Sequence, residues 1–373
     1  MKILVINWQD ITNPLGGGAE THFHEIFKRI AAMGHKVTLF CCSYDGCIAE
    51  EVIDGIHIIR AGSRLLFNLY VPIWYYKKFK NEQYDIIVDD INKIPFYTPL
   101  YVKEPLLAIS HHFFGTSIFL QANPVFALYV YVAEKLVDFI YKSTKFTVVS
   151  QSTLNEFLAR GFNKHNFTII PNAITQTDYP MQVTEKYDIP TITYFGRIKK
   201  YKSPDHLVKA FSLLLKEIPN AKLLFMGSGD FQPELEHLAK NLGIEKSVEF
   251  KGRVTELQKT EYLSKSWVVV NTSMKEGWGI TNIEANACGT PVISANVPGL
   301  SDSVRNGVSG ELYEYGNIQQ LHELIKTIVI NENIRIKLSE GAVSWAKQFS
   351  WDTSALLMID YCKKIIENSI SVR

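Results

Sequence analysis

Long apolar runs are scarce in this sequence. The longest candidate, residues 124–140, is interrupted by Glu134, Lys135 and Asp138, and no run reaches the length of a membrane span. The first residues begin directly with a strand pattern, without the charged segment and apolar core of a secretory signal. We therefore expect that any contact with a membrane is peripheral.

Cysteine pairs and metal-ligand patterns are also missing. None of the five cysteines has CxxC spacing, and no group of histidines and cysteines has the spacing of zinc ligands. The thiols are therefore expected to be reduced, which favours the cytoplasm, including the inner face of the cell membrane.

The sequence has little net charge as well. Its 39 basic and 38 acidic side chains give a formal net charge of +1, so no overall field favours nucleic acid as a partner. With 373 residues, 46% of them hydrophobic, the chain is long enough for two globular domains.

Short apolar runs alternate with helical patterns along both halves. Strands are predicted over residues 2–7, 36–41, 55–60, 84–88, 106–110, 146–150 and 167–170, and again over 191–195, 222–226, 248–250, 267–271 and 291–294. Helices are predicted over residues 19–33, 203–217, 232–242, 255–264, 281–288 and 319–329. This rhythm indicates an α/β fold with two Rossmann-like, doubly wound parallel-sheet domains, residues 1–172 and 173–352, with a polar linker over 172–189. Such sheets bind ligands at the carboxyl ends of their strands, so two domains facing each other would form a cleft.

The stretch from Lys275 to Ile293 carries the strongest functional signal. Glu276 and Glu284 frame a glycine-rich turn, which leads into a short helix and then a buried strand. Small residues there allow backbone N–H groups to approach a ligand, and amides at a helix start suit a phosphate. Each carboxylate can accept hydrogen bonds from two neighbouring hydroxyls of a ribose or a hexose. A sugar and a phosphate in one pocket indicate a nucleotide-sugar.

Three other loops lie at predicted strand ends or helix starts. Gly16 to Glu20 can hold a phosphate or form a simple tight turn, and its spacing is not the GxGxxG of dinucleotide-dependent dehydrogenases. Arg197 and Lys202 follow a strand and can neutralise a leaving diphosphate, although basic loops are more often solvated. The turn at Gly227 either closes on a ligand or only reverses the chain.

Polar side chains also end two strands of the first half. His111 and His112 follow the strand at 106–110, where a histidine can donate to a sugar hydroxyl or be satisfied by the local backbone. Asp90 follows the preceding strand and can meet a hydroxyl of an acceptor. Both acceptor-side residues, Asp90 and His112, are the weaker candidates.

Together these motifs resemble glycosyltransferase family 4, the retaining enzymes with the GT-B fold. Glu276 to Glu284 matches the family's EX7E motif, and Ala287 to Ile293 matches its next block. Further segments in the family's order are Gly17-Gly18 with His22, Pro171-Asn172-Ala173-Ile174, Phe195-Gly196-Arg197 with Lys202, and Val308-Ser309-Gly310-Glu311-Leu312-Tyr313. The resemblance covers nearly the whole chain. Two departures are Trp278, in place of the usual phenylalanine, and the polar run Thr281-Asn282-Ile283.

The resemblance implies a role for each motif. His111, Arg197, Lys202 and Glu276 would be catalytic, with the two cations on the donor diphosphate and Glu276 facing the transferred sugar. Glu284 would bind the ribose hydroxyls. The other donor-binding positions would be Gly17, Gly18, Gly196, Gly227, Gly279, Ile280 and Thr281. The last helix, over residues 353–368, would pack back on the first, acceptor-side domain.

The implied reaction moves a hexose-type sugar from a nucleotide-diphosphate sugar to a hydroxyl acceptor with retention of the anomeric configuration. No cofactor and no metal ion is expected, because two cations take the place of a divalent ion. Residues 65–80 and 129–141 mix aromatics with lysines, which suits a membrane interface and a lipid-linked or cell-surface glycan precursor as acceptor, or else helices packed on their own sheet. A non-catalytic nucleotide-sugar-binding module and a GT-B sugar epimerase are the alternatives.

Overall fold

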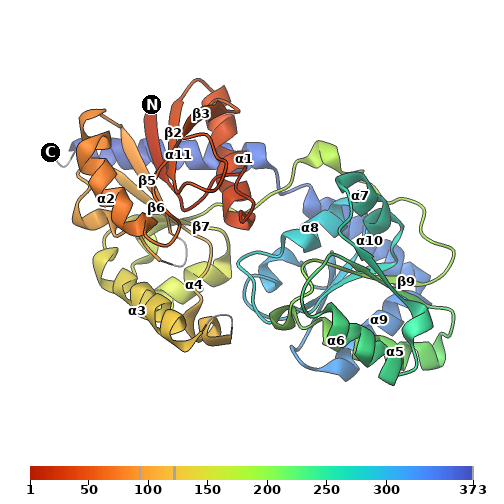
Figure 1. The fold of residues 1–373 in the computed structure, drawn as a ribbon. Coiled ribbons are helices and arrows are strands. Elements are labelled where there is room, and N and C mark those ends of the chain that lie inside the picture. The colour runs from red at the N-terminus through yellow and green to blue at the C-terminus, as the bar shows by residue number, and fades with distance from the viewer. Residues whose placement is uncertain (92–93, 121–122, 372–373) are drawn as a thin grey trace. The chain divides into compact units, whose positions relative to one another are not determined.

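The computed structural model describes residues 1–91, 94–120 and 123–371, which fold into two compact units (Figure 1). Unit 1 contains residues 1–172 together with the chain from Trp351 onwards, and unit 2 contains residues 173–350. The predicted boundary at residue 352 differs by two residues, because the last helix begins at Trp351 and belongs to unit 1.

Unit 1 is built on one sheet of almost entirely parallel strands. Among the described residues the strand order is β3-β4-β2-β1-β5-β6-β7-β8. The strands are β1 (Lys2–Ile6), β2 (Lys36–Cys41), β3 (Glu50–Ile53), β4 (Ile56–Arg60), β5 (Ile86–Ile91), β6 (Leu106–Ser110), β7 (Lys145–Val148) and β8 (Phe167–Ile169). The helices are α1 (Gly18–Ala32), α2 (Phe67–Lys77), α3 (Pro124–Ile140), α4 (Gln151–Ala159) and α11 (Trp351–Ser371). The central strands are nearly continuous runs of buried apolar residues, as expected when helices cover both faces of a parallel sheet.

Strand β3 was not predicted, and it pairs with β4 in the antiparallel direction. Asp54 and Gly55 join the two strands with positive φ angles of 48° and 79°, the backbone of a two-residue hairpin turn. The sequence does not predict this strand, because Glu50-Glu51-Val52-Ile53 is half exposed and lacks the apolar run of the buried strands.

Unit 2 is built on an entirely parallel sheet. Among the described residues its strand order is β11-β10-β9-β12-β13-β14. The strands are β9 (Thr191–Phe195), β10 (Lys222–Met226), β11 (Val248–Gly252), β12 (Val268–Asn271), β13 (Val292–Ala295) and β14 (Gly310–Tyr313). The helices are α5 (Pro204–Glu217), α6 (Gln232–Asn241), α7 (Glu256–Lys265), α8 (Ile280–Ala287), α9 (Ile318–Ile330) and α10 (Glu332–Ala346). The doubly wound α/β class predicted for both halves is confirmed, whereas β14 and α10 were not predicted as separate elements.

The segment predicted as a linker, residues 172–189, belongs to unit 2 from residue 173 onwards. The N–H of Met181 donates to the carbonyl oxygen of Ala287 at 2.9 Å. Lys186 Nζ donates to Thr290 Oγ1 at 2.7 Å and to the carbonyl oxygen of Gly289 at 3.0 Å. The segment has no periodicity because single polar contacts, rather than a helix or strand, attach it to unit 2.

Helix α11 packs beside α1 in unit 1, although the two helices lie at opposite ends of the chain (Figure 1). Arg29 Nε donates to Asp352 Oδ1 at 2.5 Å, and Ser354 Oγ donates to the carbonyl oxygen of Pro171 at 3.0 Å. Within the described ranges, no helix combines the length and the apolar character needed to cross a membrane.

Each sheet has a point where the order of its strands reverses. In unit 1 this point lies between β1 and β5, and in unit 2 it lies between β9 and β12. Ligands of doubly wound sheets bind at the carboxyl ends of the strands at this switch point, because the loops diverge there and leave room. A functional site is therefore expected at the two switch points.

Candidate functional site

In unit 2 the loops after β9 and β12 meet at the switch point. Lys202 Nζ forms an ion pair with Glu276 Oε1, and the two side chains are 15% and 19% exposed. Thr272 Oγ1 donates to the carbonyl oxygen of Lys202 at 2.9 Å, which ties the two loops together. A cation and a carboxylate therefore lie side by side at the edge of the sheet, where a ligand can still reach both.

Arg197 lies in the same loop as Lys202 and is exposed. Its Nη2 donates to Tyr201 Oη at 3.2 Å, and its carbonyl oxygen accepts from Tyr194 Oη at 3.0 Å. Arg197 makes no ion pair with any carboxylate in the described part of the chain. The guanidinium is therefore available to an anion.

Gly196 and Gly227 end the neighbouring strands β9 and β10. Their φ angles are 150° and 130°, and a Cβ atom on Gly227 would stand 2.0 Å from the carbonyl oxygen of Gly196. The N–H of Gly196 donates to the carbonyl oxygen of Met226 at 3.0 Å. Gly227 thus needs glycine because two backbones approach each other closely, and both positions favour glycine because of their positive φ angles.

In the turn before α8, the backbone N–H groups donate hydrogen bonds within the protein. Gly279 precedes the helix and Ile280 begins it. The N–H of Gly279 donates to the carbonyl oxygen of Gly299 at 3.2 Å, and the N–H of Ile280 donates to the carbonyl oxygen of Trp278 at 2.9 Å. The two amides predicted to face the donor are therefore already bonded, and a phosphate would have to replace those bonds.

A buried polar network lies beneath this turn. Asn282 is fully buried, and its Nδ2 donates to Ser303 Oγ at 2.9 Å. Asn271 Nδ2 donates to Thr281 Oγ1 at 3.1 Å. A Cβ atom on Gly279 would stand 2.3 Å from Ser303 Oγ. The polar residues at 281 and 282 thus support the turn from within the unit, which gives Thr281 a structural role.

Glu284 lies on α8 with 12% of its side chain exposed. Its Oε1 accepts from Tyr179 Oη and from Lys259 Nζ, both at 2.8 Å. Burial alone would lower the pKa of Lys259, but the carboxylates of Glu284 and Glu256 together outweigh it and raise that pKa. Burial and the same carboxylate raise the pKa of Tyr179. One oxygen of Glu284 is thus held by the protein, and the predicted ribose contact falls to Oε2.

Neither Lys259 nor Tyr179 was predicted as part of a site. They stand 25 and 105 residues from Glu284 in the sequence, so no local spacing joins them to it. A lysine on the polar helix α7 has no sequence signal that separates it from a solvated side chain.

In unit 1 the switch point holds a carboxylate–histidine pair. Asp90 on β5 is fully buried, and its Oδ1 lies 3.1 Å from Nε2 of His111, which follows β6. Asn7, which follows β1, donates from Nδ2 to Asp90 Oδ2 at 3.2 Å. Burial alone would lower the pKa of His111, but the Asp90 carboxylate outweighs it and raises that pKa. Asp90 is therefore placed to orient His111 and to raise its pKa. The predicted contact of Asp90 with an acceptor stays a prediction.

His22 on α1 packs against His111, with their ring centroids 4.9 Å apart in an edge-on arrangement. Its side chain is buried, and neither ring nitrogen has a hydrogen-bond partner among the described residues. Burial lowers the pKa of His22 well below its usual value, and the charge on His111 adds to this effect. A neutral histidine thus lies against one that favours the protonated form.

The glycine loop before α1 is partly occupied by the protein itself. The N–H of Gly17 donates to Glu20 Oε2 at 2.7 Å, which places a carboxylate at the start of the helix. Burial raises the pKa of Glu20, although the bond from Gly17 opposes this. A Cβ atom on Gly18 would meet no heavy atom within 4 Å. Space is therefore open at Gly18, whereas the amide of Gly17 already has an acidic partner.

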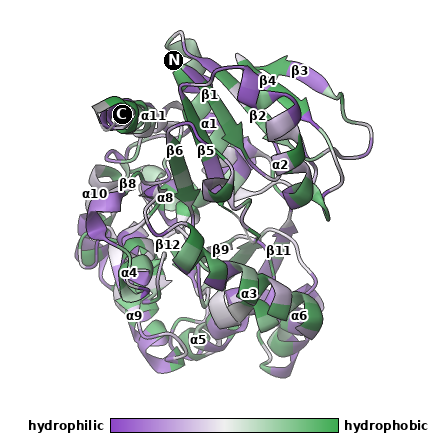
Figure 2. Ribbon diagram, turned by 90° about the vertical axis from the view of Figure 1, so that its left-hand side faces the viewer, coloured by the Kyte–Doolittle hydropathy of each residue, from purple (hydrophilic) through white to green (hydrophobic). Residues whose placement is uncertain are grey.

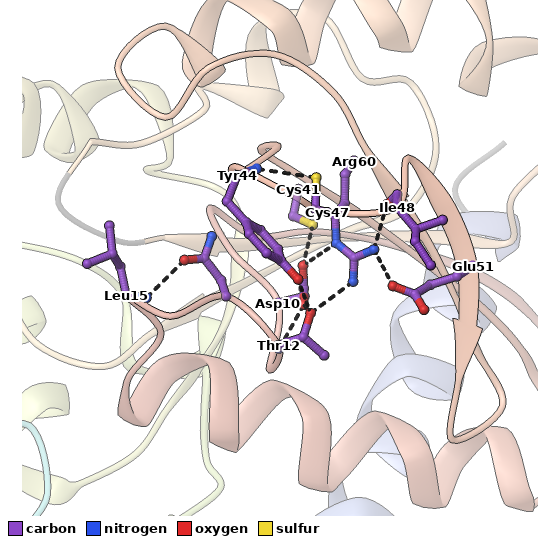
Figure 3. Close-up of polar contacts among 10 residues, drawn as sticks. Asp10, Thr12, Leu15, Cys41, Tyr44, Cys47, Ile48, Glu51 and Arg60 are labelled. Carbon is purple, nitrogen blue, oxygen red and sulfur yellow. Dashed lines mark hydrogen bonds and ion pairs between the residues drawn. The ribbon is translucent and has the colours of Figure 1, made fainter.

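A network of buried charges shapes the loop between β1 and α1 (Figure 3). Arg60 Nε donates to Asp10 Oδ2 at 2.7 Å, with both side chains fully buried. Arg60 Nη1 donates to Glu51 Oε1 at 2.5 Å, and Thr12 Oγ1 accepts from Arg60 Nη2 at 3.1 Å (Figure 3). Burial raises the pKa of Asp10, but the bonds from Arg60 and Thr12 outweigh it and lower that pKa. The loop that leads to the glycines is thus anchored by residues that no sequence motif marked.

His112, the second acceptor-side candidate, is half buried. Its ring packs on Phe114, with the centroids 4.7 Å apart. The structure therefore places it next to His111, beside the switch point of unit 1. Among the described residues, no group of three or more His, Cys, Asp or Glu side chains is placed to hold a metal ion.

Two family models together cover most of the chain. The model described as "Glycosyltransferase Family 4" matches residues 16–177, and the model described as "Glycosyl transferases group 1" matches residues 176–345. The "Poly(glycerol-phosphate) alpha-glucosyltransferase" of Bacillus subtilis (strain 168) is 31% identical over 206 residues, which are 54% of this chain and 30% of the relative. The chain spans less than half the length of the curated relatives it matches.

Solved structures match the whole chain at lower identity. A sucrose-phosphate synthase from Thermosynechococcus elongatus has a TM-score of 0.78 and 20% identity, over 98% of this chain and 99% of that one. Anabaena HepE in complex with UDP and glucose has a TM-score of 0.74 and 20% identity, over 98% of this chain and 100% of that one. These likenesses confirm the predicted GT-B fold.

Proposed function

Because this chain belongs to glycosyltransferase family 4, we propose that it is a retaining glycosyltransferase. It would move a hexose from a nucleotide-diphosphate sugar to a hydroxyl group of an acceptor. The family membership rests on the two matched models and on the GT-B fold.

The observation that carries the proposal is the group of charges at the switch point of unit 2. Arg197 is exposed without an ion-pair partner in the described structure. Lys202 lies over the Tyr201 ring and pairs with Glu276, itself partly exposed. A leaving diphosphate gains negative charge as the glycosidic bond breaks, and preorganised cations stabilise that charge. In the proposed complex Lys202 would bridge the diphosphate and Glu276, and Glu276 would then face the sugar.

Retention of configuration requires that the acceptor oxygen arrives on the face from which the diphosphate leaves. We propose that the bond from the anomeric carbon to the phosphate oxygen breaks as the bond to the acceptor oxygen forms. A phosphate oxygen of the donor takes the acceptor proton. Arg197 and Lys202 hold the diphosphate, so the step is proposed to need no divalent ion.

His111 is proposed to act on the sugar side of the reaction. Its raised pKa makes the protonated ring more populated than in an ordinary histidine, and that ring can donate a hydrogen bond to a sugar hydroxyl. Asp90 would keep the ring charged and oriented, as a carboxylate does for a histidine in other active sites.

The donor and acceptor are proposed from the relatives. The Bacillus subtilis relative is named an alpha-glucosyltransferase, and HepE binds UDP and glucose, so a UDP-hexose is the first donor to try. The acceptor is proposed to be a lipid-linked or cell-surface glycan precursor in the cytoplasm, at the inner face of the membrane.

The deciding experiment incubates the purified chain with UDP-glucose, UDP-galactose, UDP-N-acetylglucosamine and GDP-mannose, with and without glycerol-phosphate and glycan acceptors. We expect release of the nucleoside diphosphate with one donor, an α-linked product by NMR, and the same rate in EDTA. Conversion of a donor without nucleotide release would identify an epimerase instead. Donor binding without turnover on any acceptor would favour a non-catalytic module, and an EDTA loss restored by Mg²⁺ would refute metal independence.

A further inference from the structure

Helix α3 is apolar on its outward side as well as on the side that faces the core. Ala127, Val130, Ala133 and Val137 are buried against unit 1. The outward side is formed almost entirely by large apolar residues, which are Val125, Leu128, Tyr129, Val132, Leu136 and Phe139. Val125 and Phe139 are 82% and 78% exposed. A surface helix is normally polar on its outward side. The apolar outward side of α3 therefore indicates an interaction surface.

Helix α2 and the two residues before its first turn have the same character. Their exposed large residues are Leu65, Leu66, Leu69, Tyr70, Ile73 and Tyr76. Two aromatics of the segment 65–80, which the sequence assigned to a membrane interface or to a helix packed on its own sheet, face inward: Tyr75 is 1% exposed, and Trp74 packs on the core of unit 1. The apolar surface of α2 therefore includes Tyr70 and Tyr76 of the predicted aromatic segment, but not Trp74 or Tyr75.

Figure 2 labels both helices, and one hydrogen bond joins them in unit 1. Asn68 Nδ2 on α2 donates to Tyr129 Oη on α3 at 3.4 Å. The exposed apolar side chains of both helices thus belong to one region, which we call the α2–α3 surface.

The exposed charges on the two helices, and on the turn that follows α2, are lysines. Lys77, Lys80 and Lys135 are exposed on or beside the two helices. The two acidic residues of α3 are turned to other partners. Glu134 accepts from the N–H groups of Phe114 and Gly115, at 2.5 and 2.8 Å, and Asp138 pairs with Arg160 at 2.6 Å. The surface therefore presents apolar side chains and lysines without an exposed, unpaired carboxylate on either helix.

We propose that the α2–α3 surface docks on a lipid bilayer that contains anionic lipids. Apolar side chains with tyrosines at the edge suit the boundary between headgroups and acyl chains, and lysines suit anionic headgroups. The charge pattern decides between occupants, because a second copy of this surface would bring lysines against lysines. The inference goes beyond sugar transfer, because docking needs no donor and no turnover.

Vesicle sedimentation tests the proposal with the full chain. Wild type should pellet with vesicles of phosphatidylcholine and phosphatidylglycerol at low salt, and much less with phosphatidylcholine alone. Each lysine near an anionic surface contributes about fivefold to binding, so the three together contribute on the order of 10²-fold. High salt should remove most of this share, because exposed charges are screened beyond about 10 Å.

The deciding variant is Leu128→Glu with Phe139→Glu, two exposed positions whose replacement leaves the core intact. We expect at least a tenfold loss of vesicle binding. The matched control is Leu257→Glu with Ile330→Glu, two exposed apolar positions of unit 2 that should bind as wild type does. Circular dichroism confirms that all three chains are folded.

Three outcomes would overturn the proposal. Wild type would remain in the supernatant with anionic vesicles, or the α3 variant would pellet as well as wild type, or the control would lose binding equally. Sedimentation velocity gives a further check. A wild-type dimer that the α3 variant converts to a monomer, with no vesicle binding by either, would assign the surface to a second copy of the chain. Loss of vesicle binding with unchanged nucleotide release in detergent would leave the proposed transfer activity intact.

Discussion

The switch points of the two sheets differ in how their charged groups are paired. In unit 2, Lys202 and Glu276 are 15% and 19% exposed, and Arg197 is exposed without an ion pair among the described residues. In unit 1, the Asp90 carboxylate is fully buried and bound to His111, whose side chain is 12% exposed. The same position in two similar folds thus carries open charges in one unit and a buried, internally paired charge in the other.

The difference separates two uses of charge. In unit 2, Arg197 has no ion pair among the described residues, so an incoming diphosphate gains its field, whereas Lys202 would share its charge between the diphosphate and Glu276. The Asp90 carboxylate of unit 1 is bound to His111, and its effect is to raise the pKa of that histidine. We infer that the cations of unit 2 bind an anionic group of the ligand directly. In unit 1, the buried carboxylate instead adjusts the pKa of one side chain, His111.

Breaking a buried pair in unit 1 should have the largest effect. Arg60→Met leaves the Asp10 carboxylate buried without its cation, which costs roughly 3–5 kcal/mol of unfolding free energy. Lys199→Met removes the cation of the exposed Lys199–Asp230 pair of unit 2 and should change stability little. Urea denaturation followed by circular dichroism measures both. Similar losses of unfolding free energy in the two variants would contradict the contrast between buried and exposed pairs. Partial recovery of that free energy in the double variant Arg60→Met with Asp10→Leu would support it.

Removing a buried carboxyl from unit 1 should change how stability depends on pH. Burial raises the pKa of Asp89 to about 6 despite hydrogen bonds from Thr98 and Tyr141. A raised pKa means that the folded state keeps a proton that the unfolded state has lost, so stability falls as pH rises from about 4 to about 6. The shift of about 2 units sets an upper limit of about 3 kcal/mol on this fall.

The matched comparison is wild type against Asp89→Asn, denatured in urea at pH 4, 5, 6 and 7. The difference in unfolding free energy between the two chains isolates Asp89 from the other groups. It should move in favour of the variant as pH rises through this window. A difference that is constant across the window would show that Asp89 titrates normally.

Removing an open charge from unit 2 should affect turnover rather than stability. Lys202→Ala should lower sugar transfer by roughly 10²-fold, because it removes a preorganised cation from the transition state. Lys200→Ala removes an exposed cation from the same loop and should keep nearly wild-type turnover. Rates of nucleoside diphosphate release decide between the two. An equal loss in both variants would mean that the loop contributes only a general positive field.

The smallest expected effect is a change in the pKa of His111 when the carboxylate of Asp90 is removed. Asp90→Asn removes the carboxylate that raises the pKa of His111 and leaves the burial that lowers it, so the pKa of His111 should fall. NMR titration of labelled histidines measures this, with His111→Gln to assign the signal. Asp138→Asn, whose carboxylate pairs with Arg160, should leave that signal unchanged. An unmoved titration in Asp90→Asn would refute the pairing.

Local patterns predicted much of the fold and part of the candidate site. Buried strands such as β1 and β12 are apolar on both sides, so their sequence marks them without knowledge of neighbours. Arg197, Lys202 and Glu276 lie in short loops beside glycines, and these loops are contiguous enough to be recognised as motifs. The half-exposed strand β3 lacks that local signal, and it was missed.

Partners that meet only in space could not be predicted. Glu284 was expected to bind a ribose, but the residues that hold its Oε1 are Lys259 and Tyr179, which come from other segments. Asp10 and Arg60 are 50 residues apart and carry no motif. The exposure of the outward side of α3 could not be predicted either. A helix that is apolar all round has the same sequence pattern whether its outward side is covered by other elements or exposed.

The sequence by itself determined the alternation of strands and helices, the loops that carry the cations of unit 2 and the resemblance to a family. These depend on interactions between residues close in the chain, which local spacing records. Only the tertiary structure decided that Asp90 serves His111, that Glu284 is already held by Lys259, and that α3 shows an apolar face to the outside. Burial and pairing are properties of strand order and packing, which bring distant residues together and cannot be read from their spacing in the chain.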